Sequence, residues 1–337
     1  MTGRRQFLKT IGAMSAATLA PSSALFAQER VVRLNVRGGA IDVHHHFQPP
    51  GGTGNRPWSP QLSLESMDKF NIGVAILSMT QNGELLYNGT EKGRAAVRAG
   101  NEFSARLMHD HPSKFGLMGG IPMPDIDGSL REVEYAYDTL KVDGIGLLTS
   151  YDDVWLGNPA FRPVMEELNR RRAVVHVHPT AANCCRNLDY GLGPGSIEYG
   201  TDTTRAIIGV TFSGDAVRFP AIRFIWSHAG GSAPFLAGRI DGGSGGVKDR
   251  LPNGFLAEAK KFFYDTAGAA NRGALASLRE LVTPSQILFG TDFPPGGASL
   301  EAAKLLADLK MFDAAGLRAI ERDNAVKLLP RLKSSAL

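Results

Sequence analysis

Three features of the sequence predict a (β/α)8 barrel. Eight short apolar runs alternate with segments of helical periodicity over about 300 residues, the arrangement of a barrel in which a helix follows each strand. Histidine and aspartate residues stand at the ends of several runs, where a barrel would bring them to one mouth. The main competing fold, a doubly wound open sheet, usually places a glycine-rich phosphate loop after its first strand. Here that position holds Asp42-Val43-His44-His45-His46 instead.

The predicted strands are short aliphatic and aromatic runs bounded by polar residues or breakers. They cover residues 40–44, 73–79, 115–121, 142–148, 173–178, 222–228, 262–265 and 286–290. The segments between them repeat apolar residues every three or four positions, as amphipathic helices do. The clearest predicted helices are Glu91 to Asp110, Ser129 to Leu140, Pro159 to Arg172, Thr203 to Phe212, Arg272 to Leu281 and Leu300 to Leu309. The glycine-rich segment from Gly238 to Gly254 is interpreted as a long loop.

The first 27 residues are predicted to be a twin-arginine signal peptide. Arg4-Arg5 is followed by an apolar, small-residue stretch from Ile11 to Ala20 and by a cleavage site after Ala27. The apolar stretch is too short to span a bilayer as an anchor. We therefore expect a periplasmic protein without a membrane anchor, in which residues 28–337 form the barrel domain.

The charge balance excludes nucleic acid as a partner. The chain has 37 basic and 33 acidic residues, but Arg4, Arg5 and Lys9 belong to the predicted signal, which contains no acid. The mature chain then has 34 basic residues (37 less these three) against 33 acidic ones. The basic isoelectric point is mostly a property of the signal, and no electrostatic case for nucleic acid remains.

The two cysteines, Cys184 and Cys185, are adjacent, so they do not form a disulfide framework. A strained vicinal disulfide or two free thiols in a loop both fit this pattern, and the redox state is left open. We assign the pair no catalytic role.

The first candidate metal ligands are His44 and His46. Side chains alternate along a β-strand, so these two imidazoles point the same way at a strand end. His45 has the opposite parity and is expected to face the helix layer. Asp42 is expected to support the ligand pair from behind.

Further candidate ligands stand at the ends of other predicted strands. His178 ends the fifth strand, His228 ends the sixth, and Asp292 follows the eighth. Any one of them alone is more simply a capping or hydrogen-bonding residue, but jointly they can converge on one ion. Three imidazoles, a carboxylate and a water suit Zn²⁺ or another divalent transition metal with an open position. His176 shares the parity of His178 and is expected one layer deeper in the barrel.

These motifs resemble a known superfamily. Asp42-x-His44-x-His46, His178-Pro179, His228-Ala229-Gly230-Gly231 and Gly290-Thr291-Asp292-Phe293-Pro294 are similar to the motifs of the amidohydrolase superfamily, specifically of its aminocarboxymuconate-semialdehyde decarboxylase-like branch. The resemblance covers nearly all of residues 40 to 330, in order. Three further segments resemble 6-methylsalicylate decarboxylases: Trp58-Ser59-Pro60 with Leu64 to Asp68, Leu156 to Phe161, and Asp202 to Ala206.

The resemblance implies a distorted (β/α)8 barrel with one divalent metal, Zn²⁺ or alternatively Mn²⁺, at its C-terminal mouth. His44, His46, His178 and Asp292 match metal ligands, and His228 matches a histidine that hydrogen-bonds the metal-bound water or the substrate. No lysine ends the fourth strand to bridge a second metal, which favours a mononuclear site.

The resemblance also concerns substrate binding and assembly. Arg239 resembles an arginine that reaches the active site of a partner subunit, which implies a homodimer or a dimer-based oligomer. It would bind a substrate carboxylate bidentately, unless it is an ordinary surface arginine. Arg56 is a second candidate for the carboxylate.

The predicted reaction is non-oxidative decarboxylation of an aromatic acid of the ortho-hydroxybenzoate type or of an unsaturated carboxylic acid. Asp292 would protonate the ring carbon that bears the carboxylate, and His228 would stabilise the developing charge. Phe47, Trp58, Trp155 and Phe293 are candidates to clamp the ring, or are plain core. A metal-dependent hydrolase, such as a lactonase, needs the same ligands and is the alternative. A non-catalytic metal carrier is a third class, which would not need the arginines or an open metal position.

Overall fold

The computed structural model describes residues 38–49, 58–79, 87–185, 191–193, 195–294 and 306–333. The predicted signal at residues 1–27, Arg56 and most of the predicted helix from Leu300 to Leu309 lie outside the described residues. Within the described parts, no helix combines the length and the apolar character needed to cross a membrane.

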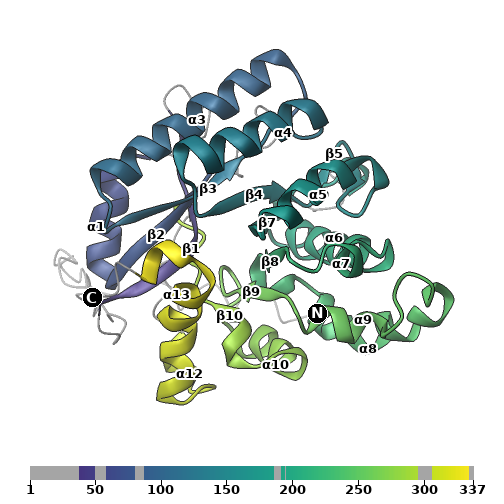
Figure 1. The fold of residues 1–337 in the computed structure, drawn as a ribbon. Coiled ribbons are helices and arrows are strands. Elements are labelled where there is room, and N and C mark those ends of the chain that lie inside the picture. Colours follow the sequence, from purple (N-terminus) through teal and green to yellow (C-terminus); the bar gives the residue numbers. More distant parts are fainter. Residues whose placement is uncertain are drawn as a thin grey trace, which may run out of the picture. The chain divides into compact units, whose positions relative to one another are not determined.

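Eight parallel strands form one sheet in the order β1-β2-β3-β4-β7-β8-β9-β10 (Figure 1). Their bounds are β1 Ala40–His46, β2 Ile72–Ser78, β3 Phe115–Gly120, β4 Gly144–Leu148, β7 Val174–His178, β8 Arg223–Trp226, β9 Phe263–Asp265 and β10 Ile287–Leu288. The chain after β10 returns to β1: Val43 N donates to Phe289 O at 2.9 Å, and His45 pairs with Phe293. This closes the sheet, so the predicted (β/α)8 barrel is confirmed.

Helices follow the strands, as Figure 1 shows. The α-helices are α1 Pro60–Phe70, α3 Glu91–Asp110, α4 Ile126–Tyr135, α5 Arg162–Arg170, α6 Glu198–Phe212, α7 Asp215–Arg218, α8 Ala233–Gly242, α9 Gly254–Ala259, α10 Arg272–Leu281, α12 Ala314–Arg318 and α13 Asn324–Leu328. Short 3-10 turns include η4 Asn183–Cys185 and η5 His228–Gly230, and π-helical turns include η2 Ala136–Leu140 and η8 Ala319–Asp323. A small hairpin, β5 Ser150–Tyr151 with β6 Val154–Trp155, follows β4. The helices predicted at 91–110 and 272–281 have the observed bounds.

The interpretation of Gly238 to Gly254 as a loop is correct only for the part between Gly242 and Gly254, which holds turns and one 3-10 turn. Helix α8 continues to Gly242, a 3-10 turn covers Ser244–Val247, and α9 begins at Gly254. Packing supports α8 despite its glycines, because Ala233, Pro234 and Ala237 are buried. Tertiary burial of one face therefore outweighs the cost of about 1 kcal/mol that each helical glycine imposes.

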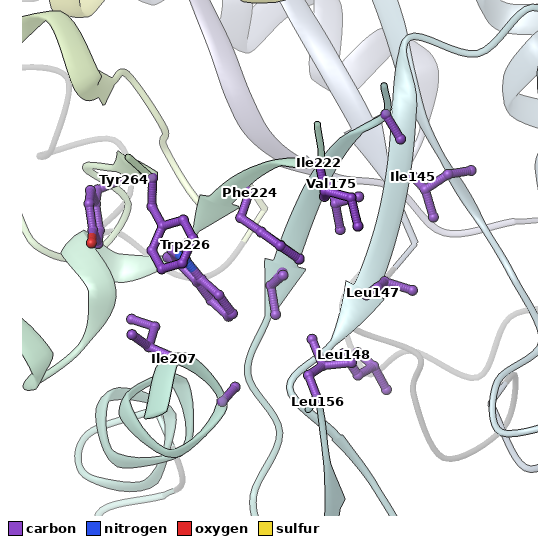
Figure 2. Packing of buried hydrophobic residues seen from close by; sticks show 14 of the residues in the cluster. Ile145, Leu147, Leu148, Leu156, Val175, Ile207, Ile222, Phe224, Trp226 and Tyr264 are labelled. Atoms are coloured by element: carbon purple, nitrogen blue, oxygen red, sulfur yellow. The ribbon is translucent and has the colours of Figure 1, made fainter. Parts of the chain in front are cut away.

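Two apolar clusters hold the barrel. The larger one lies between strands and helices; Figure 2 shows Val175, Phe224 and Trp226 on the side of the sheet that Ile207 of α6 covers. The smaller one contains Ile41, Val43, Val174, Ile225 and Leu288 from the strands. Because His176 and His178 share the parity of Val174, this cluster fills the barrel interior beneath the histidines. Leu328, Leu329 and Leu332 from the C-terminal segment join it.

Candidate metal centre

The structure brings four predicted ligands together at the C-terminal ends of the strands. One ligand atom from each of His44, His46, His178 and Asp292 lies within 4.8 Å of the others. Asp292 Oδ1 lies 3.0 Å from His46 Nε2 and 3.2 Å from His44 Nε2. The Nε2 atoms of His44 and His46 are 3.0 Å apart. His228, at the start of η5, joins the cluster from β8, with its ring 5.1 Å from that of His44 between centroids.

The hydrogen bonds of the four imidazoles fix which nitrogen faces the centre. Each Nδ1 has an oxygen partner: Asp265 Oδ2 for His44 at 2.8 Å, Ser78 Oγ for His46 at 3.3 Å, Pro179 O for His178 at 2.8 Å and Ala267 O for His228 at 2.8 Å. Such partners leave each Nε2 with a lone pair to offer. The Nε2 atoms of His178 and His228 are buried and have no hydrogen-bond partner among the described residues. Nitrogen lone pairs and a carboxylate that crowd one point fit a divalent transition metal.

Neighbouring carboxylates and burial shift the pKa values of the clustered histidines in opposite directions. Burial alone would lower the pKa of His44, but Asp265 and Asp292 outweigh it and raise the pKa to about 10. Burial lowers the pKa of His46 to about 4, against the opposing effect of Asp292. Burial also holds the pKa of His178 well below its usual value. The neighbouring carboxylates therefore favour the charged form of His44, whereas burial favours the neutral forms of His46 and His178.

Asp265, at the end of β9, is a functional residue that the sequence interpretation missed. Its Oδ2 accepts hydrogen bonds from His44 Nδ1 and, at 3.0 Å, from His176 Nε2, while its Oδ1 accepts from the backbone N of His228 at 2.9 Å. Burial would raise the pKa of this carboxyl, but His44 and His176 hold it far below the ordinary range. The signal was present in the sequence, because Asp265 ends a predicted strand just as His178 does.

A family model now identifies the chain. The amidohydrolase model matches residues 41–331. The chain belongs to the amidohydrolase family. Two curated relatives are decarboxylases: yanB of Aspergillus niger, 35% identical over 88% of this chain and 89% of the relative, and the 6-methylsalicylic acid decarboxylase of Penicillium expansum, 32% identical over 87% of this chain and 97% of the relative. These matches confirm the predicted family and the class of carboxy-lyase.

A solved structure supports the fold of this amidohydrolase. The crystal structure of a dihydroxybenzoic acid decarboxylase from Polaromonas, with bound manganese and the inhibitor 2-nitroresorcinol, aligns with a TM-score of 0.77. The alignment covers 88% of this chain and 99% of that one at 20% sequence identity. At this identity the match establishes a shared barrel and no more.

A β-bulge explains how β1 of the amidohydrolase presents its histidines. Asp42 pairs with Ala75 and His45 pairs with Leu77, so β1 has one more residue between these two pairs than β2 has. The extra residue places Asp42 on the side of His45: Asp42 Oδ2 accepts from His45 Nδ1 at 2.9 Å. As predicted, His45 faces the helices, and its Nε2 contacts Ser63 Oγ of α1 at 3.0 Å. Asp42 also accepts from the N and Oγ1 of Thr291 and, at 3.1 Å, from the backbone N of His44, so it supports both the Asp292 loop and the backbone of one candidate ligand.

Left-handed backbone positions aim two of the site residues. The φ angles are 55° at His228 and 60° at Asp292, a region that non-glycine residues seldom occupy. Asp292 is held there because its N donates to His44 O at 2.9 Å while Thr291 is tied to Asp42. Such conformations cost about 1–3 kcal/mol each and concentrate at functional sites.

The residues of the predicted aromatic clamp have other partners in the structure. Phe47 and Trp58 pack with each other, 5.9 Å apart between centroids, and with Phe103 of α3 at 6.2 and 6.3 Å. The ring of Phe293 stacks on His45, 4.5 Å away, on the helix side of β1. Trp155 Nε1 donates to Asp202 Oδ1 at 2.6 Å. These contacts are those of core and supporting residues, so a substrate role for these side chains stays a prediction.

Tyr199 is an aromatic residue at the site that sequence reasoning did not select. It lies in the first turn of α6, and its ring is nearly parallel to that of His228, with 6.2 Å between centroids and 17° between planes. It meets His178 edge to face at 5.8 Å. Only the packing of α6 against η5 could show that Tyr199 reaches two site histidines.

Arg239 lies on an exposed face of α8. It forms no ion pair with any described residue, and Phe235, one helical turn earlier, is 79% exposed. Its role, like that of Arg56, stays a prediction.

Proposed function

We propose that this amidohydrolase decarboxylates a hydroxylated benzoic acid, and that His44, His46, His178 and Asp292 hold its one divalent metal. The observation that carries the proposal is the convergence of these donors, with each imidazole Nδ1 occupied and each Nε2 turned inward. The 6-methylsalicylic acid decarboxylase of Penicillium expansum supports the substrate class, because it matches this chain almost from end to end.

A divalent metal held by these four residues would supply a Lewis acid for the substrate carboxylate. Zn²⁺ suits the donor set, and Mn²⁺ is the alternative because the Polaromonas decarboxylase holds manganese. The choice between them is open to direct metal analysis.

Asp292 and His228 supply the proton chemistry in this proposal. Asp292 Oδ1 faces the two β1 histidines, and the other carboxylate oxygen carries a proton to the ring carbon that loses CO2. His228 Nε2, buried and without a partner among the described residues, is placed to hydrogen-bond the substrate oxygen. Tyr199 stacks on the His228 ring and fixes its plane. Each turnover consumes one proton, which ends on the aromatic product.

We also propose that two copies associate through α8. Phe235 and Arg239 are four residues apart, so they share a helix face, and both are exposed in the single chain. A second copy would cover Phe235 and place Arg239 near a substrate carboxylate. Light scattering that gives the mass of a monomer would rule this out.

Export by the twin-arginine route is proposed from residues 1–27 alone. Fractionation of producing cells tests it: the mature protein is expected in the periplasm, and replacement of Arg4 and Arg5 by lysine is expected to retain it inside the cell.

The deciding assay offers 6-methylsalicylate, 2,6-dihydroxybenzoate and aryl lactones to the metal-loaded protein. We expect CO2 release from at least one acid and its loss, by about 10³-fold or more, in Asp292→Asn. Asp127→Asn is the matched control, because Asp127 is an exposed acid in the first turn of α4. Lactone hydrolysis without CO2 release would favour the hydrolase instead.

A further inference from the structure

A second reactive group lies beside the mouth of the barrel. Cys184 and Cys185 are the only cysteines of the chain, and they end the turn η4 between β7 and α6. Their Sγ atoms are 2.7 Å apart. Cys184 is exposed and Cys185 is half-buried. The proposed decarboxylation uses neither thiol.

Arg205 of α6 places a positive charge against this pair. Its Nη2 lies 4.0 Å from Cys185 Sγ, and its guanidinium lies over the Trp155 ring, 5.9 Å from the centroid. Its Nη1 is buried and has no hydrogen-bond partner in the described part of the chain. Among the described residues, no carboxylate forms an ion pair with Arg205, and Cys185 Sγ is a contact of its guanidinium. A cation beside a thiol favours the thiolate, which is the nucleophilic form.

The two thiols have different surroundings. The contact with Cys185 raises the pKa of Cys184, and either thiol can be the donor of the hydrogen bond between the two Sγ atoms. Asp153 acts in the same direction on Cys184, and it also accepts from Asn183 N at 2.7 Å, which anchors η4. Arg205 also lowers the pKa of Cys184, but less than the contact with Cys185 raises it. The contact between Arg205 and Cys185 therefore makes Cys185 the candidate attacking thiol and Cys184 the resolving one.

We propose that Cys184 and Cys185 form a peroxide-reactive dithiol that closes to a vicinal disulfide. The Cys185 thiolate attacks a hydroperoxide, so that an S–O bond forms, the O–O bond breaks and the alcohol leaves after taking a proton. Cys184 then attacks the sulfenic sulfur; the S–S bond forms and water leaves with the thiol proton. In sum, two thiols and one hydroperoxide give one disulfide, one alcohol and one water.

The product would be easily reversed. Neighbouring Cα atoms are about 3.8 Å apart, whereas disulfides usually join Cα atoms about 4.4–6.8 Å apart. A bond between adjacent residues is therefore strained, and strained exposed disulfides are the readily reduced ones. The pair is suited to reversible oxidation rather than to structural cross-linking.

The experiment follows the thiols of the reduced, metal-loaded full chain during exposure to hydrogen peroxide. Samples are alkylated under denaturing conditions and weighed intact. We expect a species that has lost two hydrogens, resists alkylation and returns to the dithiol with dithiothreitol. Cys184→Ser is expected to stop at a sulfenic acid on Cys185 that dimedone captures, and Cys185→Ser to react about tenfold more slowly than Cys184→Ser.

Arg205→Met tests the cation and is expected to slow the reaction about three- to tenfold. Arg279→Met is the matched control, because Arg279 also lies over an aromatic ring, that of Phe312 at 5.4 Å. The wild-type chain unfolded in guanidinium chloride repeats the comparison without any substitution and should react more slowly than the folded chain. Full alkylation after peroxide, equal rates for the two cysteine variants, or a folded chain no faster than the unfolded one would each overturn the proposal. None of these readouts depends on decarboxylase activity.

Discussion

Asp265 connects the proposed metal ligands with the residue that would face the substrate. One carboxylate oxygen accepts hydrogen bonds from the rings of His44 and His176, and the other accepts one from the backbone N of His228. The side chain is fully buried, so these bonds act in a medium of low dielectric. A carboxylate behind a ligand imidazole fixes the orientation of the ring and raises its basicity.

We expect Asp265→Asn to weaken metal binding by about 10–100-fold. The amide has one acceptor oxygen in place of two and carries no charge, so it cannot serve His44 and His228 together. Titration of the metal-free protein against a chromophoric chelator measures the affinity. Asp127→Asn should leave it unchanged, and an unchanged affinity in Asp265→Asn would remove the residue from the site.

Glu321 gives a prediction about the pH dependence of stability rather than about catalysis. It is buried in the π-turn η8, and burial raises its pKa to about 7. The folded state therefore holds a proton that the unfolded state releases. The contribution of Glu321 to the free energy of unfolding is fully present below pH 4.5. It is lost as the pH rises to 7, by up to about 3 kcal/mol in total.

Glu321→Gln should remove this loss, because the amide is neutral at every pH. We expect the variant to gain stability over the wild type between pH 5 and 8, in urea unfolding at a series of pH values. The gain should vanish near pH 4, and a gain that is independent of pH would point to packing instead.

At the scale of elements, the bulge in β1 shows what the sequence could and could not predict. The strands were predicted to within about two residues because apolar runs and turn residues mark them. The bulge was not, because one extra residue in a strand leaves no mark in the hydrophobic pattern and changes only the parity of Asp42. The end of helix α8, from Gly238 to Gly242, was predicted as a loop for a related reason: its glycines signal a loop, and only the neighbours that bury Ala233 and Ala237 override them.

Asp42→Asn tests whether the bulge holds the Asp292 loop. Asp42 is fully buried and accepts bonds from His45 and from both polar groups of Thr291. An amide would turn one acceptor into a donor that faces other donors, so we expect a loss of about 2–3 kcal/mol in the metal-free protein. Urea unfolding measures the loss. Asp68→Asn, which breaks only an exposed pair with Lys114, should cost less than about 0.5 kcal/mol.

The convergence of the candidate ligands could be predicted because a barrel converts distant strand ends into neighbours. His44, His178 and Asp292 are far apart in sequence, yet strand position alone predicted that they meet. Asp265 ends a predicted strand, but an acid at such a position is common, and Tyr199 lies in a helix, so contacts were needed to show what either residue supports. The sequence therefore predicts which candidate ligands converge better than which residues support them.

At the scale of the molecule, the proposed metal would reinforce the closure of the barrel. His44 and His46 belong to the first strand, Asp292 follows the last, and His178 lies on β7 at another part of the wall. The described hydrogen bonds between β1 and the chain after β10 are few, and one of them passes through Asp292 itself. An ion shared by these residues would join the two ends of the sheet.

Metal removal should therefore lower the melting temperature by several degrees. A ligand that binds only the folded state contributes about 2.7 kcal/mol at 100 times its Kd. Calorimetry on chelator-treated and reloaded protein measures the shift. His178→Ala should melt at one temperature with and without metal, because it lacks a ligand, whereas His109→Ala should keep the full shift, because the side chain of His109 is 89% exposed. Equal melting of stripped and reloaded wild type would mean that the barrel closes through its backbone bonds alone.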